Sequence, residues 1–205
     1  MIRLYDYWRS SASYRVRIAL GIAGLPWESL PVDLLKGEHL QPDYLAINPQ
    51  GLVPVVEMDG ARFSQSLAII EFLEEAHGLG LLPDDLRDRA RVRALAYAIA
   101  MDIHPICVPR VVNFAIAHSG GGMTMEAWMR NFIGTGLAAL EEMLAGGDYC
   151  FGGRLTLADI CLVPQLYNAV RWGADLSDLP KIRRIGAHLE TLPAFAAAHP
   201  DRQPH

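Results

Sequence analysis

Hydrophobic and polar positions follow β-type and helical periods in turn along the first part of the chain. Residues 2–7 form a short β-type run, and apolar side chains between Val16 and Ala23 then recur at helical spacing. Residues 27–33 form a second β-type run, in which Pro31 indicates an edge strand or an irregular position. The pattern predicts a strand, a helix and a strand in this order.

A hairpin and a helix follow a polar, broken stretch at residues 34–50, which we interpret as a loop around one short helix. Asp59 and Gly60 separate two β-type runs, which is a strong signal for a two-residue hairpin turn. Residues 64–66 then open a periodic helix that runs to Ala76. The order β-α-β-loop-β-β-α predicts a mixed sheet covered by helices.

The second part of the chain has helical periods and little β signal. Glycines and prolines at residues 77–86 mark the boundary. Helical periods then cover the segments 87–117, 124–145, 180–190 and 193–198, and a further helix is predicted to start at residues 156–159. Pro105 and Pro109 are expected to kink the first of them, and the tail 199–205 is expected to be disordered. We therefore predict a mixed α/β domain at 1–81 and an all-helical domain at 87–205.

Composition narrows the possible functions. The chain has 205 residues, 51% of them hydrophobic, and a formal net charge of −5 at pH 7. This acidic balance argues against a nucleic-acid partner, and no apolar run is long enough to predict a membrane span. Three cysteines without a C-x-x-C pair favour free thiols in a reducing cytoplasm. The histidines lack the spacing of metal ligands, so no metal site is expected.

Hydroxyl and amide side chains gather at two predicted helix starts. Ser10 and Ser11 follow Arg9 at the first helix, and Gln65 and Ser66 open the helix after the hairpin. A serine hydroxyl can cap the unpaired N–H groups of a helix start. The same N–H groups and the positive end of the helix dipole also favour an anion. The residues alone leave two interpretations open: capping only, or a seat for a thiolate or a carboxylate.

Several motifs occur in a characteristic order along almost the whole chain. They are Ser10–Leu20 (S-S-A-S-Y-R-V-R-I-A-L), Asn48–Pro54 (N-P-Q-G-L-V-P), Gln65–Glu71 (Q-S-L-A-I-I-E), Asp102–Pro105 (D-I-H-P) and Leu155–Asp159 (L-T-L-A-D). The last is also a helix-capping signature, which we interpret as structural. Together they resemble the zeta class of glutathione transferases, the class of the maleylacetoacetate and maleylpyruvate isomerases. The resemblance implies a thioredoxin-like βαβ-ββα domain followed by an all-α domain.

The resemblance also implies glutathione as the cofactor. Its thiolate would lie at Ser10, with Ser11 as the second choice, and its γ-glutamyl carboxylate at Gln65 and Ser66. The remaining implied contacts are Val53 and Pro54 for the cysteinyl backbone, His39 and Gln50 for the glycyl end, and, across the interface of a homodimer, Asp102 and His104. The sequence does not show whether the Val53–Pro54 bond is cis.

The implied reaction converts maleylpyruvate or maleylacetoacetate to its fumaryl isomer in aromatic-compound catabolism, by reversible thiolate addition to the cis double bond. A dianionic enone substrate calls for fixed cations. Arg9 adjoins the implied thiolate site, and Arg110 and Arg171 match arginines of the maleylpyruvate-isomerase-like members of the family, so the resemblance implies that all three bind the substrate. For Arg171 a plain surface position remains open.

One residue departs from the family pattern. Ala12 stands where the family signature has cysteine, so no protein thiol is available there. Bacterial maleylpyruvate isomerases, which this chain also resembles, lack that cysteine too, and this resemblance favours maleylpyruvate as the substrate. Two alternatives stay open. One is a zeta-like transferase that conjugates or dehalogenates small α-halo acids, and the other, less favoured, is a non-enzymatic binding module that resembles glutathione transferases.

Overall fold

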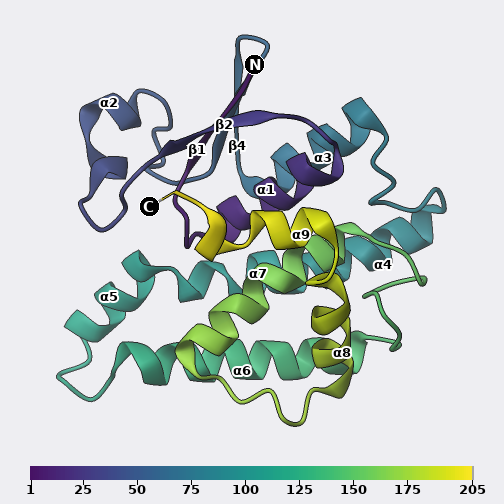
Figure 1. The fold of residues 1–205 in the computed structure, drawn as a ribbon. Coiled ribbons are helices and arrows are strands. Elements are labelled where there is room, and N and C mark those ends of the chain that lie inside the picture. Colours follow the sequence, from purple (N-terminus) through teal and green to yellow (C-terminus); the bar gives the residue numbers. More distant parts are fainter. Residues whose placement is uncertain (205) are drawn as a thin grey trace. The chain divides into compact units, whose positions relative to one another are not determined.

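The computed structural model describes residues 1–204, which fold as two compact units (Figure 1). The first comprises Met1–Leu79 and the C-terminal segment from Leu192, and the second is Gly80–Thr191. This division differs from the predicted domains at the C-terminus. The reason is that α9 (Pro193–Ala198) packs along α1 (Ser11–Ile22) in the first unit (Figure 1).

A four-stranded mixed sheet in the order β2-β1-β3-β4 forms the centre of the first unit. Its strands are β1 (Ile2–Asp6), β2 (Trp27–Pro31), β3 (Val55–Met58) and β4 (Ala61–Ser64). β1 and β2 are parallel, and β3 is antiparallel to both of its neighbours. Pro31 lies on an edge strand, and Asp59 and Gly60 form the β3–β4 turn with φ of 52° and 78°. The predicted mixed sheet and hairpin are confirmed.

Helices α1 and α3 (Ser66–His77) pack against each other and supply much of the apolar core of the first unit. Val16, Ile18 and Ile70 are fully buried, as is Leu4 of the sheet. Phe63 of β4 also stacks on Phe72 of α3, with ring centroids 4.5 Å apart. The loop between β2 and β3 carries two short helices, η1 (Glu38–Leu40) and α2 (Pro42–Leu45).

An ion pair lies inside the first unit. Arg17 of α1 and Asp6 of β1 are 0% and 2% exposed, and Arg17 Nη1 lies 2.7 and 2.8 Å from the two carboxylate oxygens. Arg17 also donates to the carbonyls of Ala198, at 3.1 Å, and Trp8, at 3.0 Å. One side chain thus ties β1, α1, the segment after β1 and α9 together.

The second unit contains helices only as regular elements. They are α4 (Leu86–Tyr97), η2 (Ala98–Ile103), η3 (Pro105–Cys107), α5 (Pro109–Ala117), α6 (Met125–Met143), α7 (Leu157–Trp172) and α8 (Pro180–Leu189). The expected break near Pro105 and Pro109 is present. η2 is a π-helix, which the hydrophobic pattern does not predict. A Cβ on Gly136 of α6 would overlap the Ile103 side chain, so glycine allows η2 and α6 to approach closely.

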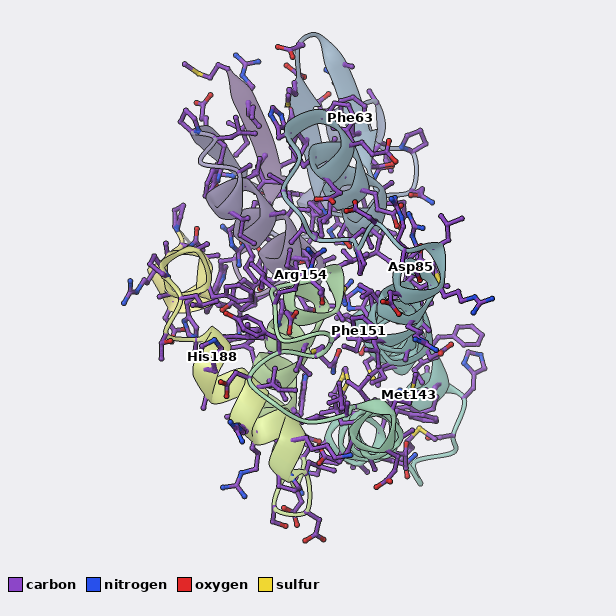
Figure 2. The ribbon with its side chains drawn as sticks, turned by 90° about the vertical axis from the view of Figure 1, so that its right-hand side faces the viewer. Phe63, Asp85, Met143, Phe151, Arg154 and His188 are labelled. Carbon is purple, nitrogen blue, oxygen red and sulfur yellow. The ribbon has the colours of Figure 1, made fainter. Side chains whose placement is uncertain are left out.

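The capping interpretation of Thr156 and Asp159 is confirmed. The Asp159 carboxylate accepts hydrogen bonds from the Thr156 N–H and hydroxyl and from the Cys150 N–H, each at 2.7 Å. Burial raises the pKa of Asp159, and these hydrogen bonds oppose the shift. Phe151 and Arg154 form an isolated antiparallel bridge in the same segment (Figure 2). The motif therefore fixes the start of α7.

The expectation of a disordered tail is wrong for the residues that the structure describes, and residue 205 lies outside them. Pro200–Arg202 form the 3₁₀-helix η4, and Gln203 Nε2 donates to the Ala197 carbonyl at 2.9 Å. Among the described helices, none is long and apolar enough to cross a membrane by itself. Only the pair 86–107 and 109–117, bent by 44°, meets that test together.

Candidate functional site

Three of the predicted site segments leave the sheet at the same end. Val55, the first residue of β3, pairs with Tyr5 near the end of β1 and with Ser64 at the end of β4. The segment before α1, the Val53–Pro54 bond and the start of α3 therefore gather at one edge of the first unit. The strand register thus brings together the predicted binding positions of the thiolate, the cysteinyl backbone and the γ-glutamyl carboxylate of glutathione.

Ser10 is the N-cap of α1, and its Oγ accepts a hydrogen bond from the Ser13 N–H at 3.2 Å. A hydroxyl that accepts in this way still has its own hydrogen to donate. No acceptor among residues 1–204 takes that hydrogen, so Ser10 can cap the helix and donate to an anion at once. Ser11, the first residue of the helix, is 4% exposed. The two interpretations of these serines are therefore compatible.

Arg9 stacks on its neighbour, with the guanidinium carbon 4.3 Å from the centroid of the Trp8 ring. Its Nε is buried and has no hydrogen-bond partner among the described residues. A buried N–H without an acceptor is costly, which marks Arg9 as a candidate for binding an anion. Because Arg17 holds the Trp8 carbonyl, the buried ion pair also helps to position this segment.

The Val53–Pro54 bond is cis. The N–H and C=O of Val53 make no hydrogen bond with the other described residues, so both remain available to an extended ligand. Tyr44 Oη and Asn48 Nδ2 each donate to the Leu52 carbonyl at 2.8 Å. Burial raises the pKa of Tyr44, which keeps its phenol protonated as a donor. The positioning role of Tyr44 and Asn48 was not predicted from the sequence, although Asn48 begins the Asn48–Pro54 motif.

No side chain caps the start of α3. Its N-cap, Gln65, has φ of 69° and makes no side-chain cap. Instead, Gln65 Nε2 donates to Gln50 Oε1 at 2.9 Å, which brings two predicted cofactor ligands together. Ser66 is 7% exposed and accepts from Arg15 Nη1 at 3.4 Å. His39 is partly buried, and burial lowers the pKa of its imidazole.

Four predicted site residues belong to the second unit. Asp102 is exposed near the end of η2, and His104 follows it at intermediate burial. Arg110 is exposed on α5, and Arg171 is exposed near the end of α7, with its guanidinium carbon 4.8 Å from the Trp172 ring centroid. Their assignment to cofactor or substrate stays a prediction. Within residues 1–204, no group of three or more His, Cys, Asp or Glu side chains could hold a metal ion.

Models of two protein-family domains match most of the chain: the glutathione S-transferase N-terminal domain at residues 4–81 and the C-terminal domain at residues 126–196. The chain belongs to the glutathione S-transferase family. A maleylacetoacetate isomerase of Rhizobium meliloti (strain 1021) is 56% identical to it, over 97% of this chain and 96% of the relative.

Solved structures place the chain in the zeta class of this family. The holo structure of a maleyl pyruvate isomerase, a bacterial zeta-class glutathione S-transferase, shares 43% identity with a TM-score of 0.94, covering 98% of both chains. A maleylacetoacetate isomerase from Methylobacterium extorquens AM1, with bound malonate and GSH, also shares 43% identity. Its TM-score is 0.92, again with 98% of both chains covered. The predicted family and fold are confirmed.

Proposed function

We propose that this chain is a glutathione-dependent cis–trans isomerase that converts maleylpyruvate or maleylacetoacetate to the fumaryl isomer. The names of its relatives support this activity. The observation that carries the proposal is the shared edge at which the N-terminus of α1, the free Val53 backbone and the open start of α3 meet.

The residues at this edge fit glutathione, a tripeptide with a thiol and two carboxylates. The Val53 N–H and C=O can pair with its cysteinyl backbone as an added strand. Ser66 and the uncapped N–H groups of α3 suit its γ-glutamyl carboxylate. Because Gln65 and Gln50 are hydrogen-bonded to each other, we place Gln50 beside the γ-glutamyl end as well. We keep His39 at the glycyl end.

When bound, glutathione would supply a thiolate that adds to the cis double bond, so that the resulting single bond can rotate before the thiolate is expelled and the trans double bond forms. The chain's part in this chemistry is electrostatic. Ser10 donates its hydroxyl hydrogen to the sulfur, and the N-terminus of α1 adds its partial positive charge. Ala12 offers no thiol of its own, so the protein holds the reacting sulfur and does not provide it.

Arg9 binds a carboxylate of the substrate. Its guanidinium is held against Trp8 and has a buried Nε that needs an acceptor, and a planar fork of donors matches a carboxylate. The malonate in one related structure supports a dicarboxylate ligand in that protein. Arg110 and Arg171 as further substrate ligands, and Asp102 and His104 as cofactor ligands from a second copy, rest on the resemblance.

The test follows the absorbance of maleylpyruvate and of maleylacetoacetate with glutathione far below the substrate concentration. The proposal predicts many turnovers per glutathione. Loss of glutathione equal to loss of substrate would indicate the alternative, a transferase acting on compounds such as small α-halo acids. Binding without any turnover would leave only a glutathione-binding module. The ratio of kcat/KM values decides between the two substrates, because the 56% identical relative is named for maleylacetoacetate although Ala12 favours maleylpyruvate.

We also propose a cytoplasmic homodimer that acts in aromatic-compound catabolism. Exposed apolar side chains such as Met101, which is 55% exposed and adjoins Asp102, support an interface with a second copy. Sedimentation equilibrium should give twice the chain mass of 22.6 kDa. A monomer at micromolar concentration would contradict the dimer and, with it, the roles of Asp102 and His104 across the interface.

A further inference from the structure

A second buried arginine lies behind the start of α3. Arg15 of α1 is 1% exposed, and its Nη1 donates to Ser66 Oγ at 3.4 Å. The sequence analysis assigned no role to Arg15, and the proposed isomerase chemistry does not use it. Across the α1–α3 contact it reaches Ser66, the residue at which we place the γ-glutamyl carboxylate.

In the hydrogen bond between Arg15 and Ser66, the arginine is the donor and the serine is the acceptor. A guanidinium can only donate, so Ser66 must accept from it, and the Ser66 hydroxyl hydrogen is left for another acceptor. No described residue accepts that hydrogen. Gln65 provides no side-chain cap either, so the first N–H groups of α3 and the Ser66 hydroxyl can address the same ligand.

The positive charge of Arg15 also favours an anionic ligand at Ser66. A guanidinium that is almost fully buried is screened by water much less than one on the surface. An anion bound to Ser66 would lie one hydroxyl group away from this charge. A carboxylate is therefore favoured there over a neutral group.

We propose that Arg15 is a positioning residue that makes the start of α3 selective for the γ-glutamyl carboxylate. It orients the Ser66 hydroxyl toward the ligand and supplies a buried positive charge behind it. This inference rests on the proposed function, because it takes glutathione as the cofactor. Arg15 itself need not touch the ligand.

The test measures equilibrium binding by calorimetry with two probes, glutathione and γ-aminobutyryl-cysteinyl-glycine, which lacks only the γ-glutamyl carboxylate. Arg15→Met should weaken glutathione binding about tenfold or more, which is about 1.4 kcal/mol, and change binding of the analogue by less than about twofold. Ser66→Ala should show the same selectivity. Arg62→Met, which removes an exposed arginine of β4, is the matched control and should change neither affinity.

Equal weakening of both probes by Arg15→Met would show a merely structural role and overturn the proposal, as would unchanged binding of glutathione. If Arg15→Met does not fold, Arg15→Lys provides the test of the positioning role. It keeps the charge, so its preference for glutathione over the analogue should stay within about threefold of the wild type, and loss of that preference would overturn the proposal.

The wild-type protein separates this inference from the proposed function. A wild-type chain that binds glutathione with the expected preference but isomerises neither enone would overturn the isomerase activity alone. A wild-type chain that binds neither probe would overturn the cofactor and the role of Arg15 together.

Discussion

Removing the buried guanidinium of Arg17 should destabilise the protein strongly. In Arg17→Met the Asp6 carboxylate, whose side chain is 3% exposed, would lose its buried ion-pair partner, which costs about 3–5 kcal/mol. The carbonyls of Trp8 and Ala198 would each lose a donor, at about 1 kcal/mol apiece. The expected loss is thus about 5 kcal/mol or more, a large part of the roughly 5–15 kcal/mol by which proteins are stable.

Urea unfolding followed by tryptophan fluorescence measures this loss. The double variant Asp6→Asn with Arg17→Met removes the isolated charge as well, so it should recover about 2 kcal/mol relative to Arg17→Met alone. Arg62→Met breaks the exposed pair with Glu57 and should cost less than about 1 kcal/mol. An Arg17→Met loss as small as that of Arg62→Met, or a double variant no more stable than the single one, would refute the reasoning.

Three further outcomes are expected. Gly136→Ala should destabilise the protein by about 1–3 kcal/mol because its Cβ would overlap an isoleucine of η2. Gly134→Ala, on the same helix with open space around it, should stabilise the protein by about 0.5–1 kcal/mol. Equal changes in the urea midpoint of the two variants would contradict this expectation. Burial raises the pKa of the Cys107 thiol to about 11 and that of Cys150 well above its usual range. Both thiols are protonated below these values, so iodoacetamide at about pH 7.5 should leave turnover intact and Cys150 unlabelled by mass spectrometry. Arg9→Ala should lower kcat or raise KM at least tenfold, about 1.4 kcal/mol, and unchanged kinetics would remove Arg9 from the site.

Local signals explain why much of the fold could be predicted. The turn at Asp59-Gly60 and the edge position of Pro31 depend on neighbours in the sequence, and both are confirmed. The start of α7 follows from Thr156 and Asp159 for the same reason. Elements that depend on contacts with residues far along the chain could not be predicted from these local signals. The π-helix η2, for example, lies against Gly136, a contact that the hydrophobic period does not encode.

The two arginines of α1 show the same limit at the site. Arginine is rarely fully buried unless it is paired, and a helical pattern gives no reason to expect Arg15 and Arg17 in the core. Arg15 contacts Ser66 and Arg17 contacts Ala198, which are 51 and 181 residues away in sequence, so only the folded chain shows these contacts. The sequence motifs indicate residues that we place at the ligand. The residues that position them, such as Arg15 and Arg17, are identified only by their contacts in the folded chain.

Turnover at substoichiometric glutathione tests the central claim most directly. With glutathione at about one hundredth of the substrate concentration, we expect complete conversion of maleylpyruvate or maleylacetoacetate to the fumaryl isomer, with the glutathione recovered unchanged. Conversion that stops once the glutathione is consumed, or no conversion of either enone by a chain that binds glutathione, would contradict it.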